Sequence, residues 1–284
     1  MATFVKNHKS PYPALSPDLP GRSLAGKSVL ITGASRGVGK HLVRGFAEAQ
    51  ASRIGIIGKD KTRIETARAE FSAEYPKITF IAYAVDVLDE DAVAAVFQCF
   101  GAPDFLVNNA GVFPDDSPFV KQNLKAWFAG FEVNVLGTAI VTQKFLQARQ
   151  PSAASVVINI SSMAAHMRFP LIAWSGYNAS KLAQVRVFEN LRFEHPDVKF
   201  FNVHPGNIES DGFTRSGAAP PPSGMTDGKL AGLFCAWLAN EEAAFLTGRF
   251  VWAEWDIDEL KAKKDEILER DLLLTTIDGF EKGF

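Results

Sequence analysis

A short apolar segment followed by a glycine-rich turn constrains the fold of this chain more than any other feature. Residues 28–32 are Ser-Val-Leu-Ile-Thr, and the turn Gly33-Ala34-Ser35-Arg36-Gly37-Val38-Gly39 separates them from a helical pattern between Lys40 and about Gln50. Glycine lets a backbone approach a ligand closely, and the free N–H groups of a helix N-terminus favour anions. This order of strand, turn and helix predicts a phosphate cradle for a dinucleotide. The spacing Gly-x-x-x-Gly-x-Gly differs from the common Gly-x-Gly-x-x-Gly, so the prediction rests on the flanking elements.

The rest of the chain alternates between apolar, β-branched segments and helical patterns. This alternation predicts an α/β fold with a doubly wound, Rossmann-type parallel sheet of about seven strands and helices on both faces. Ligands of such sheets bind beyond the carboxyl ends of the strands. Strands are expected at residues 28–32, 53–58, 78–85, 105–108, 155–160, 199–204 and 249–253, and further helices at residues 61–75, 89–100, 123–149, 175–194 and 228–239.

Length and composition fit one domain with attachments at both ends. With 284 residues, 47% of them hydrophobic, the chain can bury the core of a single dinucleotide-binding domain over residues 26–256. Residues 1–25 are expected to form an N-terminal arm that either wraps the domain or is disordered, and residues 257–284 a helical tail. Residues 209–227 are rich in glycine and proline and are expected to form a substrate lid without regular structure.

Charge and composition exclude several classes of function. The net charge is −2 with both signs interspersed, so nucleic acid is not an expected partner. We expect no membrane span, because the longest apolar run noted, Leu230 to Ala239, has about half the length that a bilayer needs. Cys99 and Cys235 are too few for a disulfide framework or a metal site, which favours a cytoplasmic protein.

One pair of side chains suggests proton transfer. Tyr177 and Lys181 stand four residues apart at the start of a predicted helix, so they share one helix face. A nearby ammonium favours the phenolate, so Lys181 is expected to lower the pKa of Tyr177. A phenol with a lowered pKa can donate and accept a proton near neutral pH.

Together these features resemble the short-chain dehydrogenase/reductase family, from about Gly26 to Trp255. The Trp252–Asp256 segment and the arm are also similar to reductases of fungal specialised metabolism. The matching segments occur in the family's order: Thr32 to Gly39, Asp86-Val87, Asn108-Asn109-Ala110-Gly111, Asn134-Val135-Leu136-Gly137, Ile158-Asn159-Ile160-Ser161-Ser162, Tyr177 to Lys181, and Pro205-Gly206.

The resemblance implies four catalytic residues. Tyr177 would exchange a proton with the substrate oxygen while hydride moves to or from the nicotinamide, and Lys181 would also bind the nicotinamide ribose. Ser162 would hydrogen-bond the substrate oxygen, with Ser161 as the alternative because the interval to Tyr177 is longer than is usual in the family. Asn134 would hold a water that links Lys181 to solvent.

The resemblance also implies a cofactor site, and charge favours NADP over NAD. No carboxylate ends the second strand at Gly58, whereas Lys59 and Arg36 could flank a 2′-phosphate, although Asp60 is adjacent. Asp86 would meet the adenine. The residues expected to bind the cofactor are Gly33, Ser35, Arg36, Gly37, Val38, Gly39, Lys59, Asp86, Val87, Asn108, Ala110, Tyr177, Lys181, Pro205, Gly206, Ile208 and Ser210.

The expected function is NADP(H)-dependent exchange of hydride with a carbonyl or secondary alcohol of a small, apolar substrate. Phe213, Met225, Phe169 and Trp174 would line its pocket, and a homodimer or homotetramer is expected from the resemblance. His166 would be a polar lining residue or, alternatively, a second acid. The alternative functions are a reaction without net redox change, as in a cyclase or dehydratase, and nicotinamide-binding regulation.

Overall fold

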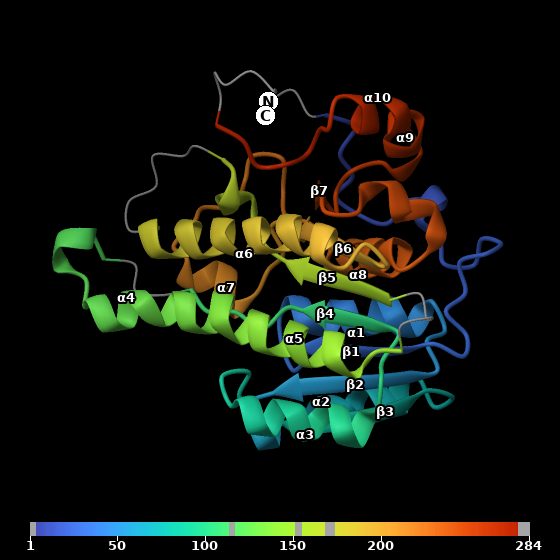
Figure 1. The fold of residues 1–284 in the computed structure, drawn as a ribbon, viewed down its shortest axis with the longest axis horizontal. Coiled ribbons are helices and arrows are strands. Elements are labelled where there is room, and N and C mark those ends of the chain that lie inside the picture. Colours follow the sequence, from blue (N-terminus) through green and yellow to red (C-terminus); the bar gives the residue numbers. More distant parts are fainter. Residues whose placement is uncertain (1–3, 114–116, 151–154, 168–173, 278–284) are drawn as a thin grey trace.

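The computed structural model describes residues 4–113, 117–150, 155–167 and 174–277 (Figure 1). Its centre is a parallel sheet of seven strands in the order β3-β2-β1-β4-β5-β6-β7, which confirms the predicted fold class. The order reverses direction at β1, next to β4, where a doubly wound sheet opens a crevice for ligands. The strands are β1 (Ser28–Thr32), β2 (Arg53–Gly58), β3 (Thr79–Ala84), β4 (Phe105–Asn108), β5 (Ser155–Ile160), β6 (Val198–His204) and β7 (Phe250–Trp252).

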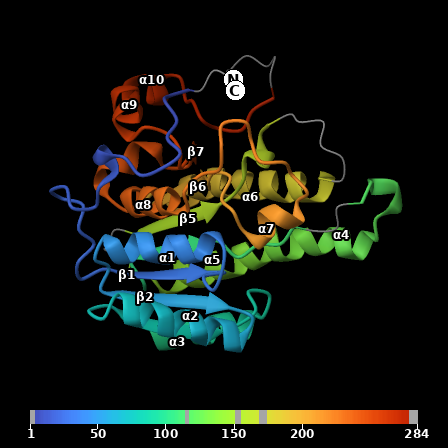
Figure 2. The same cartoon turned by 180° about the vertical axis from the view of Figure 1, so that it is seen from behind.

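Helices cover both faces of this sheet because side chains alternate between the faces along each strand. Val29 and Ile31 belong to the larger core, which α1, α2 and α8 cover, whereas Leu30 belongs to a second core under α3, α5 and α6. Figure 1 shows α5 and α6 in front of the sheet, and Figure 2 shows α1 and α8 from behind. The helices named here are α1 (Val38–Glu48), α2 (Lys61–Glu74), α3 (Glu90–Phe100), α5 (Thr138–Ala148), α6 (Ser175–Glu194) and α8 (Gly228–Leu238).

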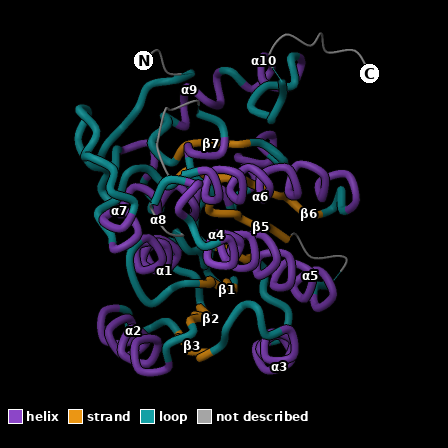
Figure 3. Tube along the Cα trace, turned by 90° about the vertical axis from the view of Figure 1, so that its left-hand side faces the viewer, coloured by secondary structure: helices purple, strands orange, loops and turns teal. Residues whose placement is uncertain are grey.

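The single long helix predicted over residues 123–149 has three parts. α4 (Leu124–Phe131) begins at Asn123, whose side chain accepts hydrogen bonds from the N–H groups of Lys125 and Ala126. A π-helical segment, Glu132–Gly137, joins it to α5. Figure 3 shows α4 and α5 as one continuous rod. Such π-segments are often found at functional sites, and this one contains Asn134.

The predicted lid contains more regular structure than expected, whereas the described part of the tail is helical as expected. Inside the lid, α7 (Asp211–Arg215) begins where the Ser210 hydroxyl accepts a hydrogen bond from the N–H of Phe213. The tail holds α9 (Ile257–Ala262), which Asp256 caps, and α10 (Lys264–Glu269). Both cases show that a side-chain cap can start a helix within a glycine-rich or charged segment.

The helical stretch from Leu124 to Ala148 is long and apolar enough to span a membrane by length and composition. The sequence expectation of no membrane span considered only the shorter run from Leu230 to Ala239. In the fold, Val141 and Phe145 of this stretch point from α5 into the second core and are buried there. Packing against the sheet therefore accounts for part of its apolar composition.

The arm lies along the part of the chain that follows β7. Val5 and Leu15 are buried there, and Asn7 forms an antiparallel bridge with Trp255. The tail covers the edge of the sheet, since the N–H of Phe250 in β7 donates a hydrogen bond to the carbonyl of Leu273. Figure 1 shows the arm in blue beside α9 and α10 in red.

Candidate active site

The glycine turn after β1 forms one wall of a cavity of about 430 Å³. Gly33 has a φ of +63°, which L side chains rarely adopt. A Cβ on Gly39 would lie 2.1 Å from the carbonyl oxygen of Gly33, so only glycine fits at that position. The backbone is therefore open to a ligand at the N-terminus of α1, which fits the phosphates of a dinucleotide.

The end of β4 is tied to the end of β1. The Thr32 hydroxyl accepts hydrogen bonds from the N–H groups of Asn109 and Ala110, each at 2.9 Å. The Asn109 side chain donates to the carbonyls of Thr32 and Gly33, each at 3.0 Å. These bonds hold the segment after β4 against the glycine turn and leave Asn109 and Ala110 in the cavity wall.

Asn108, which was expected to bind the cofactor, is not among the residues that line this cavity. Its buried side chain donates to the Thr142 hydroxyl of α5 at 2.8 Å, on the other side of the sheet. Successive strand residues point to opposite faces, so Asn109 takes the place in the cavity wall that we expected for Asn108.

Charged side chains of both signs line the cavity at the end of β2. Lys59 forms an ion pair with Asp86 at 2.7 Å, and Arg36 forms one with Asp211 at 2.7 Å. Burial disfavours the charge of Asp86, but the hydrogen bonds from Lys59 and the Leu88 N–H hold the pKa of its carboxyl below the ordinary value. Both expected cations therefore face the cavity, each with a carboxylate partner.

A second cavity of about 260 Å³ holds the predicted proton-transfer residues. Ser162, which follows β5, and Tyr177, in the first turn of α6, form a hydrogen bond between their side chains. Ser161 instead is buried and donates to the carbonyl of Lys181 at 3.3 Å. The geometry thus brings Ser162, and not the hydroxyl of Ser161, to the phenol.

The pKa of Tyr177 is raised in this structure, whereas Lys181 was expected to lower it. The removal of water from the phenol raises its pKa above the ordinary value, and the hydrogen bond with Ser162 acts in the opposite direction. The Lys181 ammonium is 5.9 Å from the ring centroid and donates to the carbonyl of Ile160 at 3.0 Å. Burial lowers the pKa of Lys181 to about 8.

Asn134 connects the segment after β4 to α6. Its carbonyl oxygen accepts from the N–H of Val112 at 2.8 Å, and its amide donates to the Val112 carbonyl at 3.1 Å and to the Ser180 hydroxyl at 2.9 Å. Both amide hydrogens are used, so only the second lone pair of the oxygen can accept a hydrogen bond from a water.

The two cavities adjoin each other. Val38, Asn109, Gly111 and Ser210 belong to the walls of both. A ligand as long as a dinucleotide can therefore extend from the glycine turn to Tyr177. The expected residues Pro205, Gly206 and Ile208 line the end that contains Tyr177.

Comparisons with known proteins agree with this geometry. The family described as short chain dehydrogenase matches residues 27–220. The chain belongs to this family. A fungal relative, the short chain dehydrogenase/reductase AacuD of Aspergillus aculeatus, is 36% identical over 257 residues, which cover 89% of this chain and 88% of that protein. The expected likeness to fungal reductases is confirmed.

Solved structures show the same short chain dehydrogenase fold with either cofactor. A protein of Escherichia coli complexed with NADPH matches with a TM-score of 0.73 and 22% identity. The match covers 83% of this chain and 100% of that chain. A 3-oxoacyl-[acyl-carrier protein] reductase of Brucella melitensis with bound NAD has a TM-score of 0.73 and 24% identity, covering 87% and 97% of the two chains.

Aromatic rings surround the phenol of this short chain dehydrogenase. Phe113 lies 4.8 Å from the Tyr177 ring, between centroids, and 5.0 Å from the ring of Trp174. Phe213 lines the same cavity as these three, as expected. Met225 does not, because it lines a separate cavity beside the arm, and Phe169 lies outside the described residues.

Some residues of the site could not be predicted from single motifs. Arg63 and Arg215 line the cavity near Lys59, and Phe113 lies beside Tyr177. Arg63 could have been found by searching for cations in the helix after β2, since it lies in the first turn of α2. His166 lines a different cavity of about 610 Å³ between the arm, the tail and α6, where its ring accepts a hydrogen bond from Trp252.

Proposed function

We propose that this short chain dehydrogenase is an NADP(H)-dependent oxidoreductase that interconverts a carbonyl and a secondary alcohol of a small, apolar substrate. One observation carries the proposal. The hydrogen-bonded pair Ser162 and Tyr177 lines a cavity that adjoins the glycine cradle after β1 and shares wall residues with it. A redox cofactor and a proton source are thereby brought to one place.

The chain's own residues bind, orient and exchange the proton. Bound nicotinamide supplies or accepts the hydride. Tyr177 gives its proton to the carbonyl oxygen in reduction and takes one from the alcohol in oxidation. Ser162 hydrogen-bonds the same oxygen and stabilises the charge that develops on it. Lys181 binds the nicotinamide ribose, and a water held at Asn134 connects it to solvent.

Charge near β2 supports a preference for NADP. Arg36, Lys59, Arg63 and Arg215 line the cavity, and β2 ends at Gly58 without a carboxylate. Asp60, two residues after the end of β2 in the sequence, accepts a hydrogen bond from the Arg63 N–H as the cap of α2. A 2′-phosphate would therefore meet guanidinium and ammonium groups, which bind phosphate strongly.

We further propose that the protein is a cytoplasmic homodimer or homotetramer. Several large apolar side chains on α4 to α6 are exposed, among them Phe128, Leu136 and Val187. In Figure 1 these helices lie together on one side of the molecule. A second copy would remove that apolar surface from water.

The direct test of the function combines cofactor titration with a substrate panel. We expect tighter binding of NADPH than of NADH, and consumption of NADPH with at least one apolar ketone, with the alcohol identified as product. Tight cofactor binding without turnover of any ketone or alcohol would favour a non-redox function. A preference for NADH would overturn the NADP assignment.

A further inference from the structure

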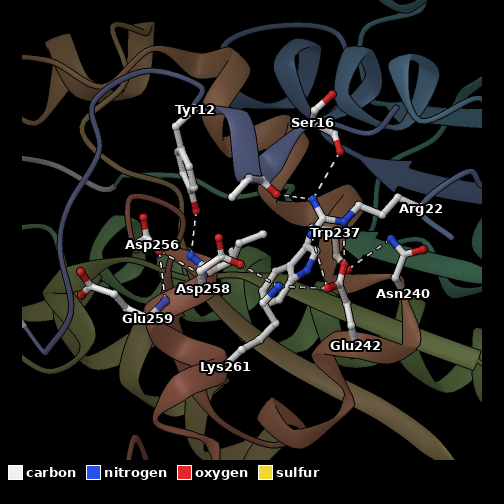
Figure 4. Close-up of polar contacts among 12 residues, drawn as sticks. Tyr12, Ser16, Arg22, Trp237, Asn240, Glu242, Asp256, Asp258, Glu259 and Lys261 are labelled. Atoms are coloured by element: carbon white, nitrogen blue, oxygen red, sulfur yellow. Dashed lines mark hydrogen bonds and ion pairs between the residues drawn. The ribbon is translucent and has the colours of Figure 1, made fainter. Parts of the chain in front are cut away.

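After Lys9, the N-terminal arm is fixed to the body of the protein by polar contacts at Tyr12 and Arg22. The Tyr12 hydroxyl accepts a hydrogen bond from the Ile257 N–H at 2.9 Å and donates to the Trp255 carbonyl at 3.0 Å. The buried guanidinium of Arg22 lies 2.6 Å from the Glu242 carboxylate. Figure 4 shows Tyr12 beside the start of α9 and Arg22 facing Glu242.

Between its start and Tyr12, the arm runs along the chain that follows β7. The N–H of His8 donates to the carbonyl of Glu254 at 2.6 Å, and the N–H of Asp256 donates to the carbonyl of Lys6 at 2.9 Å. These bonds fix the backbone before Lys9, and the carbonyl of Lys9 itself accepts a hydrogen bond from the Asp227 N–H at 2.8 Å. The Lys9 side chain then extends toward the interior.

A buried carboxylate receives the Lys9 ammonium. The Glu254 side chain is 1% exposed, and its Oε1 lies 2.6 Å from Lys9 Nζ. The same oxygen accepts a hydrogen bond from the hydroxyl of Thr226. An isolated carboxylate would be costly in this position, so the arm supplies the charge that makes Glu254 tolerable there.

Thr226 in turn supports the loop after β6. Its hydroxyl oxygen accepts a hydrogen bond from the Asn207 N–H at 3.1 Å, and its own N–H donates to the Asn207 carbonyl at 2.9 Å. A Cβ on Gly206 would lie 2.6 Å from this hydroxyl oxygen, so the loop packs directly against Thr226. The other side of the loop, from Pro205 to Ile208, lines the cavity that contains Tyr177.

We infer that Lys9, Glu254 and Thr226 form a buried polar relay through which the arm positions the loop 205–208 for the nicotinamide end of the cofactor. The inference rests on the proposed function. Lys9 and Glu254 are positioning residues, because they act on the cavity only through Thr226. Without the ammonium, Glu254 is an uncompensated buried charge, and the Thr226 hydroxyl loses its fixed acceptor.

The test uses variants of the full-length protein that separate charge from packing. Lys9→Met keeps the aliphatic stem and removes the ammonium, and Glu254→Gln keeps an oxygen acceptor for Thr226 and removes the carboxylate. Lys6→Met, at an exposed position of the same arm, is the matched control. NADPH binding is measured by fluorescence, and thermal unfolding verifies that each variant is folded.

We expect Lys9→Met to weaken NADPH binding about 10-fold or more, Lys6→Met to leave it unchanged, and the double variant Lys9→Met/Glu254→Gln to bind within about 3-fold of the parent. Rescue by the second substitution distinguishes a charge relay from lost packing. Thr226→Val, which replaces the hydroxyl with a methyl group, should also weaken binding about 10-fold and serves if Lys9→Met does not fold.

Two results would overturn the inference in different ways. Binding by folded Lys9→Met or by Thr226→Val that equals the parent's would remove the relay and leave the proposed function intact. A parent protein that binds neither NADPH nor NADH would remove the proposed function, and the relay with it.

Discussion

Tyr177 and Lys181 show how burial decides the charge of a side chain. Each group loses water, so burial raises the pKa of the phenol and lowers the pKa of the amine to about 8. Both shifts favour the neutral form, which for Tyr177 is the form that holds a proton to give. A motif of two residue types predicts their proximity, but it does not predict how much water the fold removes from each.

The two serines after β5 differ in their contacts, so their substitution should have different effects. Ser162→Ala removes the hydroxyl next to Tyr177 and should lower kcat by about 10²- to 10³-fold. Ser161→Ala removes only a long hydrogen bond to the Lys181 carbonyl and should retain most activity. Steady-state kinetics of both variants with the same ketone compare their kcat values with that of the parent. Near-normal turnover of Ser162→Ala would assign the role to another group.

Lys181 should make folding stability depend on pH in a defined window. Its pKa is about 8 in the folded protein and 10.5 as a free side chain, so between these values the unfolded chain binds more protons. The free energy of unfolding should therefore rise with pH from about 8 to 10, by up to about 1.4 kcal/mol per pH unit from this group. Denaturant titrations of the parent and of Lys181→Met measure the difference, and identical pH slopes would contradict the assigned burial.

One close helix crossing stabilises the packing of α1, the helix that follows the glycine turn. α1 and α8 meet at Gly45 and Gly232, and a Cβ on Gly45 would lie 2.1 Å from the backbone carbonyl carbon of Gly232. Backbone atoms cannot move aside as a flexible side chain can. Gly45 is therefore required by packing and not by its own backbone conformation.

Gly45→Ala should therefore lower the free energy of unfolding by about 1–3 kcal/mol, as overpacked cores do. Gly212→Ala is the control, because the nearest atom to its added Cβ would be 3.8 Å away. Thermal or denaturant unfolding measures the stability of both variants. Equal stability of the two variants would mean that the helices are farther apart than described.

The regular elements could be predicted well from the sequence, and the irregular ones could not. Strands buried on both faces are uniform apolar runs, so β1, β2, β4 and β5 begin and end where the pattern indicates. The π-segment within residues 132–137 has the same composition as its flanking helix turns, so no periodicity separates it. α7 depends on one hydrogen bond from the Phe213 N–H to Ser210, which a glycine-rich composition obscures.

At the scale of the whole molecule, the site depends on residues that no local motif joins. The glycine turn, Ser162 and the Tyr177–Lys181 pair could be found because each has a local signature. Lys9 of the arm precedes Thr226 by about 220 residues and Glu254 by 245 residues in the sequence. These residues come into contact only in the folded protein. Pairing of the Lys9 ammonium with Glu254 could therefore not be inferred from the sequence.

The exposed apolar side chains of α4 to α6 predict self-association. Light scattering coupled to size exclusion should give the mass of two or four chains. Val187→Asp introduces a charge on the exposed part of α6 and should shift the protein toward smaller species without changing its fold. A parent protein that is monomeric at micromolar concentration would contradict this prediction.

The proposed function requires the Tyr177 hydroxyl to transfer the proton beside a bound nicotinamide. The most direct measurement compares Tyr177→Phe with the parent in NADPH binding and in single-turnover reduction of one accepted ketone. We predict cofactor binding within a few fold of the parent and a rate of reduction lower by about 10²- to 10⁴-fold. A Tyr177→Phe variant that binds NADPH and reduces the ketone at the parent's rate would contradict the account.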